Sequence, residues 1–451
     1  MSISVFFASL GCDKNLVDTE KMMALLPAPE FSLTEDETEA DVIVVNTCAF
    51  ILDAKEESIE TILELAEMKK EGRCKAIIAT GCLAQRYPDE LKKEIPEVDA
   101  IVGTTAYDGI ADVIRDVMKD DSEASNDLMK ELNYLPKELI GRVRTGFAPY
   151  RYLKIAEGCN KRCTYCAIPA MRGPYRSVPM EELVNEAEML AQDGAVELIL
   201  VAQETTLYGV DIYGKKALPE LLHKLCKIDG IEWIRLMYCY PEEITKELIE
   251  AMRDEPKVCH YLDIPIQHAD DEILRRMGRR TDQKELVEKI SMIREILPDV
   301  SIRTTLISGF PGETIEHHNA CMDFVKKMRF DRLGVFPYSE EEGTPAAGFS
   351  DSVDESERKR RADEIMEASQ EVIFDKNKEL IGEKLQVLVE GYLPDEGCYM
   401  GRSYRDAPEI DGLVFFESET ERLTSETVWV NITEAKGYDL KGDISCICRI
   451  P

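Results

Sequence analysis

The sequence predicts a mixed α/β protein with an N-terminal parallel-sheet domain, a central (β/α)6 partial barrel and a C-terminal all-β barrel. Short apolar runs alternate with helical patterns over the first 120 residues, and this alternation restarts on a larger scale from Tyr150. After a long charged helix, only strand-like runs follow. We place the domains at residues 1–120, 145–375 and 376–451, with a linker at 121–144.

The N-terminal domain is predicted from three continuous apolar runs, at residues 5–8, 42–45 and 76–79. Runs of this kind are typical of parallel strands that are buried on both faces. Residues 58–66, between the second and third runs, carry apolar side chains at helical spacing. The polar and charged stretch at 119–127 has no clear period and indicates a linker.

The central domain is predicted from six further strand-like runs, most of which are separated by helical segments. Repeated β/α units imply parallel strands, and six of them can form a partial barrel related to the closed eight-stranded kind. The runs lie at residues 152–155, 198–201, 233–236, 261–264, 302–307 and 333–336.

The last part of the chain follows a charged helix near residues 358–378. Strand-like runs at 385–390, 413–416 and 427–432 are separated by Gly, Pro, Asp and Glu. This pattern is typical of an all-β module, and about seventy residues suffice for a small barrel of the OB-like kind.

The composition is strongly acidic, with 55 Lys and Arg against 88 Asp and Glu and a formal charge of −33. Because nucleic acids are normally held by Lys and Arg, this charge excludes a generic nucleic-acid binder and favours a basic partner. No apolar run approaches the ~18 to 20 residues that span a bilayer, and the first residues do not resemble a secretory signal. Together with 14 cysteines, this predicts a cytoplasmic protein without membrane contact, whose clustered thiols bind metal.

The most specific motif holds Cys159, Cys163 and Cys166 on a loop directly after the first strand of the central domain. A cubane of four irons and four sulfides normally takes four cysteines, so three cysteines leave one iron open. An open position binds a substrate or cofactor, as it does in catalytic zinc sites. A structural zinc site with a distant fourth ligand is the alternative.

Three other cysteines, Cys12, Cys48 and Cys82, each follow an apolar strand of the first domain. Because the carboxyl ends of parallel strands meet at one edge of the sheet, we expect these three thiols to converge there. Three ligands again leave one iron of a second cluster exchangeable, and such a position can carry an external sulfur species. Cys74 precedes its strand and is expected to be a free thiol at the opposite side.

The Cys-x-x-x-Cys-x-Tyr-Cys motif at 159–166 resembles that of the radical S-adenosylmethionine superfamily, which the six-stranded partial barrel also fits. The resemblance implies that S-adenosylmethionine chelates the open iron and is split by an electron from the cluster to give a 5′-deoxyadenosyl radical. It also implies that Tyr165 lies beside the adenine and that Gln203, Glu204 and Arg303 contact this cofactor. A paired core charge is the alternative role for Arg303.

The whole chain resembles the methylthiotransferase branch of this superfamily, in which a cluster domain, a radical domain and a C-terminal TRAM domain follow one another. Residues 9–20, 46–51, 261–268 and 401–411 are similar to the branch member that modifies an aspartate on the twelfth protein of the small ribosomal subunit. Members that modify tRNA usually carry Gln-Met-Asn where this chain has Asp13-Lys14-Asn15. The resemblance implies hydrogen abstraction from the aspartate β-carbon, sulfur from the first-domain cluster, and a methyl group from a second S-adenosylmethionine.

The charge of the last domain favours the same substrate independently. Residues 376–451 hold nine Lys and Arg but fifteen Asp and Glu, whereas a module that grips RNA is expected to be basic. We therefore expect weak or absent RNA contact, with the basic ribosomal protein as substrate and a flavodoxin- or ferredoxin-type electron donor. A tRNA adenosine methylthiotransferase and a non-catalytic iron–sulfur carrier are the alternatives.

Three weaker features are not expected to form sites. The basic runs at 275–280 and 358–361 are interpreted as solvated helix faces, although each could touch ribosomal RNA. His317 and His318 are adjacent on an expected surface helix, and Cys446 and Cys448 would face the same side of a strand, but two ligands alone do not make a metal site.

Overall fold

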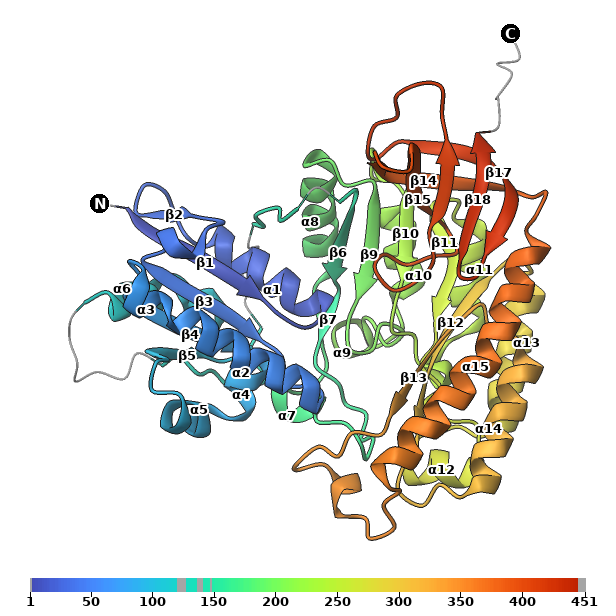
Figure 1. Ribbon diagram of the computed structural model, residues 1–451, viewed down its shortest axis with the longest axis horizontal. Coiled ribbons are helices and arrows are strands. Elements are labelled where there is room, and N and C mark those ends of the chain that lie inside the picture. Colours follow the sequence, from blue (N-terminus) through green and yellow to red (C-terminus); the bar gives the residue numbers. More distant parts are fainter. Residues whose placement is uncertain (1, 120–126, 136–140, 147, 445–451) are drawn as a thin grey trace. The chain divides into compact units, whose positions relative to one another are not determined.

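The computed structural model describes residues 2–119, 127–135, 141–146 and 148–444 (Figure 1). Cys446 and Cys448 lie outside these residues. The chain divides into two compact units. The first consists of Met1–Gly146, Lys154–Val178 and Glu341–Thr344, and the second of Phe147–Leu153, Pro179–Glu340 and Pro345–Pro451. The loop with Cys159, Cys163 and Cys166 therefore folds with the N-terminal sheet.

The first unit is built on a parallel sheet in the order β2-β1-β3-β4-β5 (Figure 1). Its Val- and Ile-rich strands β3 and β4 are buried along their whole length, because helices cover both faces. The prediction of a parallel-sheet domain is thus confirmed. The strands are β1 (Ile3–Ser9), β2 (Phe31–Leu33), β3 (Val42–Thr47), β4 (Ala76–Gly81) and β5 (Ala100–Val102).

Helices α1 and α6 pack on one face of this sheet through Met22, Ile110 and Ile114, and α2 and α4 pack on the other through Ile62 and Leu83. These apolar side chains, together with the buried strand residues, form two separate cores. The helices are α1 (Asp13–Ala24), α2 (Leu52–Ala66), α3 (Met68–Glu71), α4 (Cys82–Arg86), α5 (Pro88–Glu94) and α6 (Ile110–Val117).

The described part of the expected linker lies along the edge of the sheet. Leu128 forms a parallel bridge with Val102, and the backbone N–H of Ile101 donates to Asp127 Oδ1 at 3.0 Å. Further on, Arg142 is ion-paired with Glu20 of α1. The linker prediction also covers residues 120–126 and 136–140, which lie outside the described part of the chain.

The second unit contains the six expected parallel strands, in the order β13-β12-β11-β10-β9-β6. They alternate with helices, which confirms the (β/α)6 partial barrel. The strands are β6 (Tyr150–Lys154), β9 (Glu197–Val201), β10 (Trp233–Leu236), β11 (Val258–Asp263), β12 (Ser301–Ser308) and β13 (Arg332–Pro337). The helices are α8 (Met180–Gln192), α9 (Val210–Tyr213), α10 (Leu218–Leu225), α11 (Lys246–Asp254), α12 (Asp271–Arg276), α13 (Gln283–Ile296), α14 (Ile315–Met328) and α15 (Glu355–Glu379).

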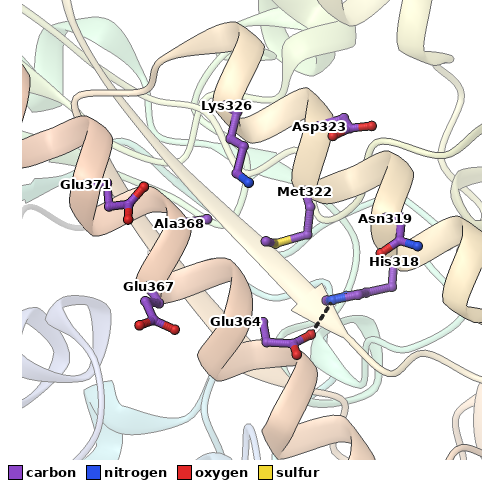
Figure 2. A pocket seen from close by; sticks show the side chains of 9 residues that line it. All are labelled: His318, Asn319, Met322, Asp323, Lys326, Glu364, Glu367, Ala368 and Glu371. Atoms are coloured by element: carbon purple, nitrogen blue, oxygen red, sulfur yellow. Dashed lines mark hydrogen bonds and ion pairs between the residues drawn. The ribbon is translucent and has the colours of Figure 1, made fainter.

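Helices α14 and α15 run side by side and leave a shallow acidic groove between them (Figure 2). In this groove the ring of His318 contacts Glu364, with 2.9 Å between Nε2 and Oε2. The neighbouring His317 instead accepts the backbone N–H of Thr314 at 3.2 Å and caps the start of α14. The two adjacent histidines therefore have separate structural contacts. No helix in the described ranges is long and apolar enough to cross a membrane.

The C-terminal part of this unit is a closed barrel in the order β14-β15-β16-β18-β17, as predicted for the last domain. Its core is aliphatic and aromatic, and includes Val387, Phe416 and Val430. The strands are β14 (Lys384–Leu393), β15 (Cys398–Ser403), β16 (Val414–Glu417), β17 (Thr427–Lys436) and β18 (Asp439–Ile444).

The end of β15 and the segment that follows it close the amino end of the partial barrel with buried charges. Glu197, the first residue of β9, accepts from Arg235 Nε at 2.7 Å and from Arg402 Nη2 at 2.6 Å. Asp331, directly before β13, is paired with Arg405 at 2.8 Å. Because these side chains fill the amino end, only the carboxyl end of the partial barrel is left for a ligand. Barrels of this kind place their active sites at that end.

These ion pairs shift the pKa values of both carboxyl groups. Burial would raise the pKa of Glu197, but Arg402 and Arg235 outweigh it and hold this pKa below its usual range. Burial would also raise the pKa of Asp331, but Arg405 outweighs it and lowers this pKa below its ordinary value. In each case the folded state binds the proton more weakly than the unfolded chain.

We expect the second unit to lose stability in acid because of these two groups. A carboxyl group whose pKa is lower in the folded state than in the unfolded chain stabilises the folded state when it is ionised. This stabilisation is fully present above the unfolded pKa, which is near 4.5 for Glu197 and 3.8 for Asp331. It is lost as pH falls through the lower folded pKa values. The free energy of unfolding, measured by urea titration at several pH values from 7 to 3, should fall below about pH 4.5. A Glu197→Gln variant should show a shallower acid limb than the parent, and an equal slope in both proteins would contradict the assignment.

Candidate functional site

The first three candidate ligands lie at the carboxyl ends of three neighbouring strands. Cys12 follows β1, Cys48 follows β3 and Cys82 follows β4, and these strands are adjacent in the sheet. Cys12 and Cys82 also stand where α1 and α4 begin, and helix N-termini favour negatively charged sulfur. Cys12 is exposed, whereas Cys48 and Cys82 are buried.

Contacts among the three loops bring these thiols together. A Cβ atom added to Gly11 would lie 2.8 Å from Cys48 Sγ, so the first loop runs directly against the second cysteine. Burial, together with negative charge on Cys82 and Cys12, raises the pKa of Cys48 to about 11. The three sulfurs are therefore close enough to interact electrostatically, as the strand topology predicts.

Asn15 joins the loops that carry these cysteines. Its Nδ2 donates to the carbonyls of Leu10 and Thr47, at 2.9 Å each, which lie just before Cys12 and Cys48. Its Oδ1 lies 4.0 Å from Cys82 Sγ. A single buried amide thus contacts all three strand ends, a role that was not predicted from the sequence.

We expect Gly11→Ala to weaken this site. Gly11 has φ of +82°, which is strained for alanine, and the new Cβ would lie 2.7 Å from Cys48 Cβ. The variant should lose about 1 to 3 kcal/mol of stability and bind less iron after anaerobic reconstitution. Gly146→Ala is the matched control, because Gly146 also has positive φ, +67°, but has open space around its Cβ position. Equal iron content in both variants would show that the close approach to Cys48 is unimportant.

The second three cysteines lie on a loop that is closed at its base by the antiparallel pair β7 (Ala156–Glu157) and β8 (Arg176–Ser177). The backbone N–H of Cys159 donates to Gly173 O at 3.1 Å, and that of Cys166 donates to Cys163 O at 3.2 Å. Inside the loop, the N–H of Lys161 donates to Cys159 Sγ at 3.4 Å. Burial raises the pKa of Cys166 to about 12. The short helix α7 (Ile168–Arg172) follows directly.

All six candidate ligands are cysteines, and thiolates are the usual ligands of iron–sulfur clusters. Within the described ranges, no group of three or more His, Cys, Asp and Glu side chains is arranged around one metal ion. In a cubane each cysteine binds a different iron, so the sulfurs stand farther apart than the ligands of one tetrahedral ion. None of the twelve described cysteines forms a disulfide, and Cys74 is buried just before β4.

The four residues expected to contact S-adenosylmethionine are distributed over both units. Tyr165 lies on the cysteine loop of the first unit. Gln203 and the buried Glu204 follow the carboxyl end of β9 in the second unit. Arg303 is the third residue of β12, and its Nη1 contacts Asp263 Oδ1 at 2.9 Å. The structure thus gives Arg303 the paired charge that was the alternative role.

A buried group of charges beside the first three thiols was not predicted from the sequence. Arg172, the last residue of α7, donates from Nε to Cys82 Sγ at 3.4 Å. It is also paired with Asp18 at 2.7 Å and with Glu157 at 3.3 Å, and Lys154 contacts Glu157 at 2.6 Å. Only a charged residue on an otherwise apolar short helix could have drawn attention to Arg172.

Three family models match consecutive parts of the chain. Uncharacterized protein family UPF0004 matches residues 4–103, the radical SAM superfamily matches 153–325, and the TRAM domain matches 381–444. A solved structure of the radical S-adenosylmethionine methyltransferase TsrM from Kitasatospora setae is similar with a TM-score of 0.59 at 15% identity, covering 77% of each chain. At that identity the likeness concerns the fold alone.

Curated relatives match almost the whole chain. A ribosomal protein uS12 methylthiotransferase RimO from Lachnoclostridium phytofermentans is 57% identical over 440 residues, which cover 98% of this chain and 99% of the relative. The protein of the same name from Pelobacter propionicus is 47% identical and covers 98% and 97%. With the domain order and both sets of cysteines in place, the chain belongs to the ribosomal protein uS12 methylthiotransferase family of radical SAM proteins.

Proposed function

We propose that this protein is a transferase that adds a methylthio group to the β-carbon of an aspartate on ribosomal protein uS12. The observation that carries the proposal is the presence of two sets of three cysteines in one compact unit, one at the sheet edge and one on the adjoining loop. Each set leaves one iron of a four-iron cluster without a protein ligand. Two open iron positions suit a reaction that needs both a radical and a sulfur donor.

The two sets of cysteines would hold clusters with different roles in this reaction. Cys159, Cys163 and Cys166 would hold the cluster that binds S-adenosylmethionine, and Cys12, Cys48 and Cys82 the cluster that carries sulfur. When bound, these groups supply the hydrogen-abstracting radical, the sulfur and the methyl group. We assign Tyr165, Gln203 and Glu204 to the cofactor, and Arg303, which is also paired with Asp263, stays a proposed contact.

The acidic surface supports a basic protein as the partner rather than RNA. Of the few cations in the C-terminal barrel, Arg402 and Arg405 are buried in ion pairs with Glu197 and Asp331. They are not free to neutralise phosphates, which RNA binding requires. We further propose that the protein works in the cytoplasm with a flavodoxin- or ferredoxin-type electron donor, and that its direct contact with RNA is weak.

A substrate assay tests the proposal. Anaerobically reconstituted protein is incubated with S-adenosylmethionine, a low-potential reductant, and either uS12 or bulk tRNA, and each product is weighed by mass spectrometry. Gain of one methylthio group on an aspartate-containing uS12 peptide is expected. Modification of tRNA alone would favour the adenosine enzyme, and a loaded sample that releases no 5′-deoxyadenosine would favour an electron carrier.

A further inference from the structure

Arg172 connects the two sets of cysteines. It lies six residues after Cys166, at the end of the helix that follows the second set, yet its side chain contacts Cys82 of the first set at 3.4 Å. The side chain is 4% exposed, so water does not screen the contact. A guanidinium has donors in a rigid fork and stays protonated, which makes it a fixed positive charge at this sulfur.

The other contacts of Arg172 hold this fork in place. Its Nη1 donates to Asp18 Oδ2 at 2.7 Å and to Glu157 Oε2 at 3.3 Å, while Nη2 donates to Asn15 Oδ1. Asn15 is the residue that fixes the loops before Cys12 and Cys48. The Nε–H group directed at Cys82 is therefore positioned by three neighbours, two of which belong to α1.

The charges around Arg172 balance when both cations are present. Asp18 and Glu157 carry two negative charges, and Arg172 and Lys154 carry two positive charges, all of them buried. Loss of Arg172 would leave one net negative charge in a low-dielectric region beside Cys82. Negative charge there opposes the addition of an electron to any cluster that Cys82 binds.

We propose that Arg172 is a positioning residue that raises the reduction potential of the cluster held by Cys12, Cys48 and Cys82. The inference rests on the proposed function, which assigns a cluster to these cysteines. A hydrogen bond to a ligand sulfur and a nearby positive charge both stabilise the reduced cluster, which has gained one electron from a low-potential donor. Because Arg172 is carried by the segment of the other cluster, the two sites are linked through one side chain.

The test uses a full-length parent in which only the first cluster can form, made with Cys159→Ala, Cys163→Ala and Cys166→Ala. The reconstituted parent is titrated with dithionite against redox mediators, and the reduced cluster is followed by electron paramagnetic resonance. At the potential where half of the parent cluster is reduced, Arg172→Met should lower the ratio of reduced to oxidised cluster at least tenfold, or about 59 mV for one electron. Arg172→Lys, which keeps the charge, should stay within threefold of the parent.

Arg115→Met is the matched control, because Arg115 belongs to the same unit but pairs with Glu30 and Asp112 on the surface. It should not change the potential. An unchanged potential in a fully loaded Arg172→Met variant would overturn the inference alone, whereas a parent that binds no iron would also remove the proposed first cluster.

A second measurement needs no substitution of Arg172. In the parent labelled with ¹⁵N-arginine, electron spin-echo modulation of the reduced cluster should detect one nitrogen coupled across the Nε–H to sulfur contact. The absence of arginine nitrogen coupling in the loaded parent would overturn the inference even if Arg172→Met failed to fold.

Discussion

Replacing Cys12, Cys48 and Cys82 together by alanine is expected to abolish methylthiolation while 5′-deoxyadenosine release continues. The three thiols come from the ends of adjacent strands and contact loops that Asn15 holds together. Without them only the Cys159, Cys163 and Cys166 loop can hold a cluster, so iron should fall from about eight to about four atoms per chain. Iron and sulfide analysis, together with product masses, measures both effects in one preparation.

Cys74→Ala is the matched control for this triple variant. Cys74 is a buried free thiol of the same unit and lies before β4, at the opposite end of the strand from Cys82. Its replacement should leave the iron content and the methylthio product unchanged. A triple variant that still binds the full iron content would show that the three strand-end cysteines do not hold a cluster.

The strands with the clearest sequence signal are those whose residues are apolar without interruption, although runs with polar residues, such as 302–307, were predicted as well. Runs such as 42–45 and 198–201 predict a buried strand directly from their composition. A parallel strand that is buried on both faces has no polar side. Strands β15 and β18 were missed because each contains a glycine where the next backbone approaches closely. A Cβ at Gly401 would lie 2.2 Å from Leu388 O, and one at Gly442 would lie 2.2 Å from Asn431 O.

The candidate ligands were predictable for a related reason, since each cysteine stands at a fixed place relative to an apolar strand or to the other members of a short motif. Arg172 was not predictable, because its partners Asp18 and Cys82 lie 154 and 90 residues away in the sequence. The pairing of Arg303 with Asp411, at 3.7 Å, also depends on the approach of a distant domain. Local patterns thus identify ligands, while the charges that surround them require the fold.

Glu197→Gln is expected to destabilise the second unit by about 3 to 5 kcal/mol, the usual cost of removing one partner from a buried ion pair. Glu197 and Arg235 are fully buried, Arg402 is 1% exposed, and the carboxylate is the shared acceptor of both guanidiniums. Glutamine keeps the shape but removes the negative charge, which leaves two buried cations facing one another. The substitution therefore acts on the contact that closes the amino end of the partial barrel.

Tryptophan fluorescence during urea unfolding measures this effect selectively. The chain contains two tryptophans, and both lie in the second unit. Trp233 is buried on β10, two residues before Arg235, and Trp429 lies on β17 of the C-terminal barrel. The urea concentration at the midpoint of the Trp233 fluorescence change should be lower in Glu197→Gln than in the parent. The stability of the first unit should not change.

Glu417→Gln is the matched control, because Glu417 pairs with Lys441 at 3.5 Å on the surface of the C-terminal barrel, with side chains 69% and 40% exposed. Exposed pairs of this kind contribute at most about 1 kcal/mol, so the control should unfold close to the parent. The two variants make the same chemical change and differ in burial and in the number of cations left behind. If Glu197→Gln lowered the stability to urea no more than Glu417→Gln does, the buried charges would not be what holds the C-terminal barrel against the strands of the partial barrel.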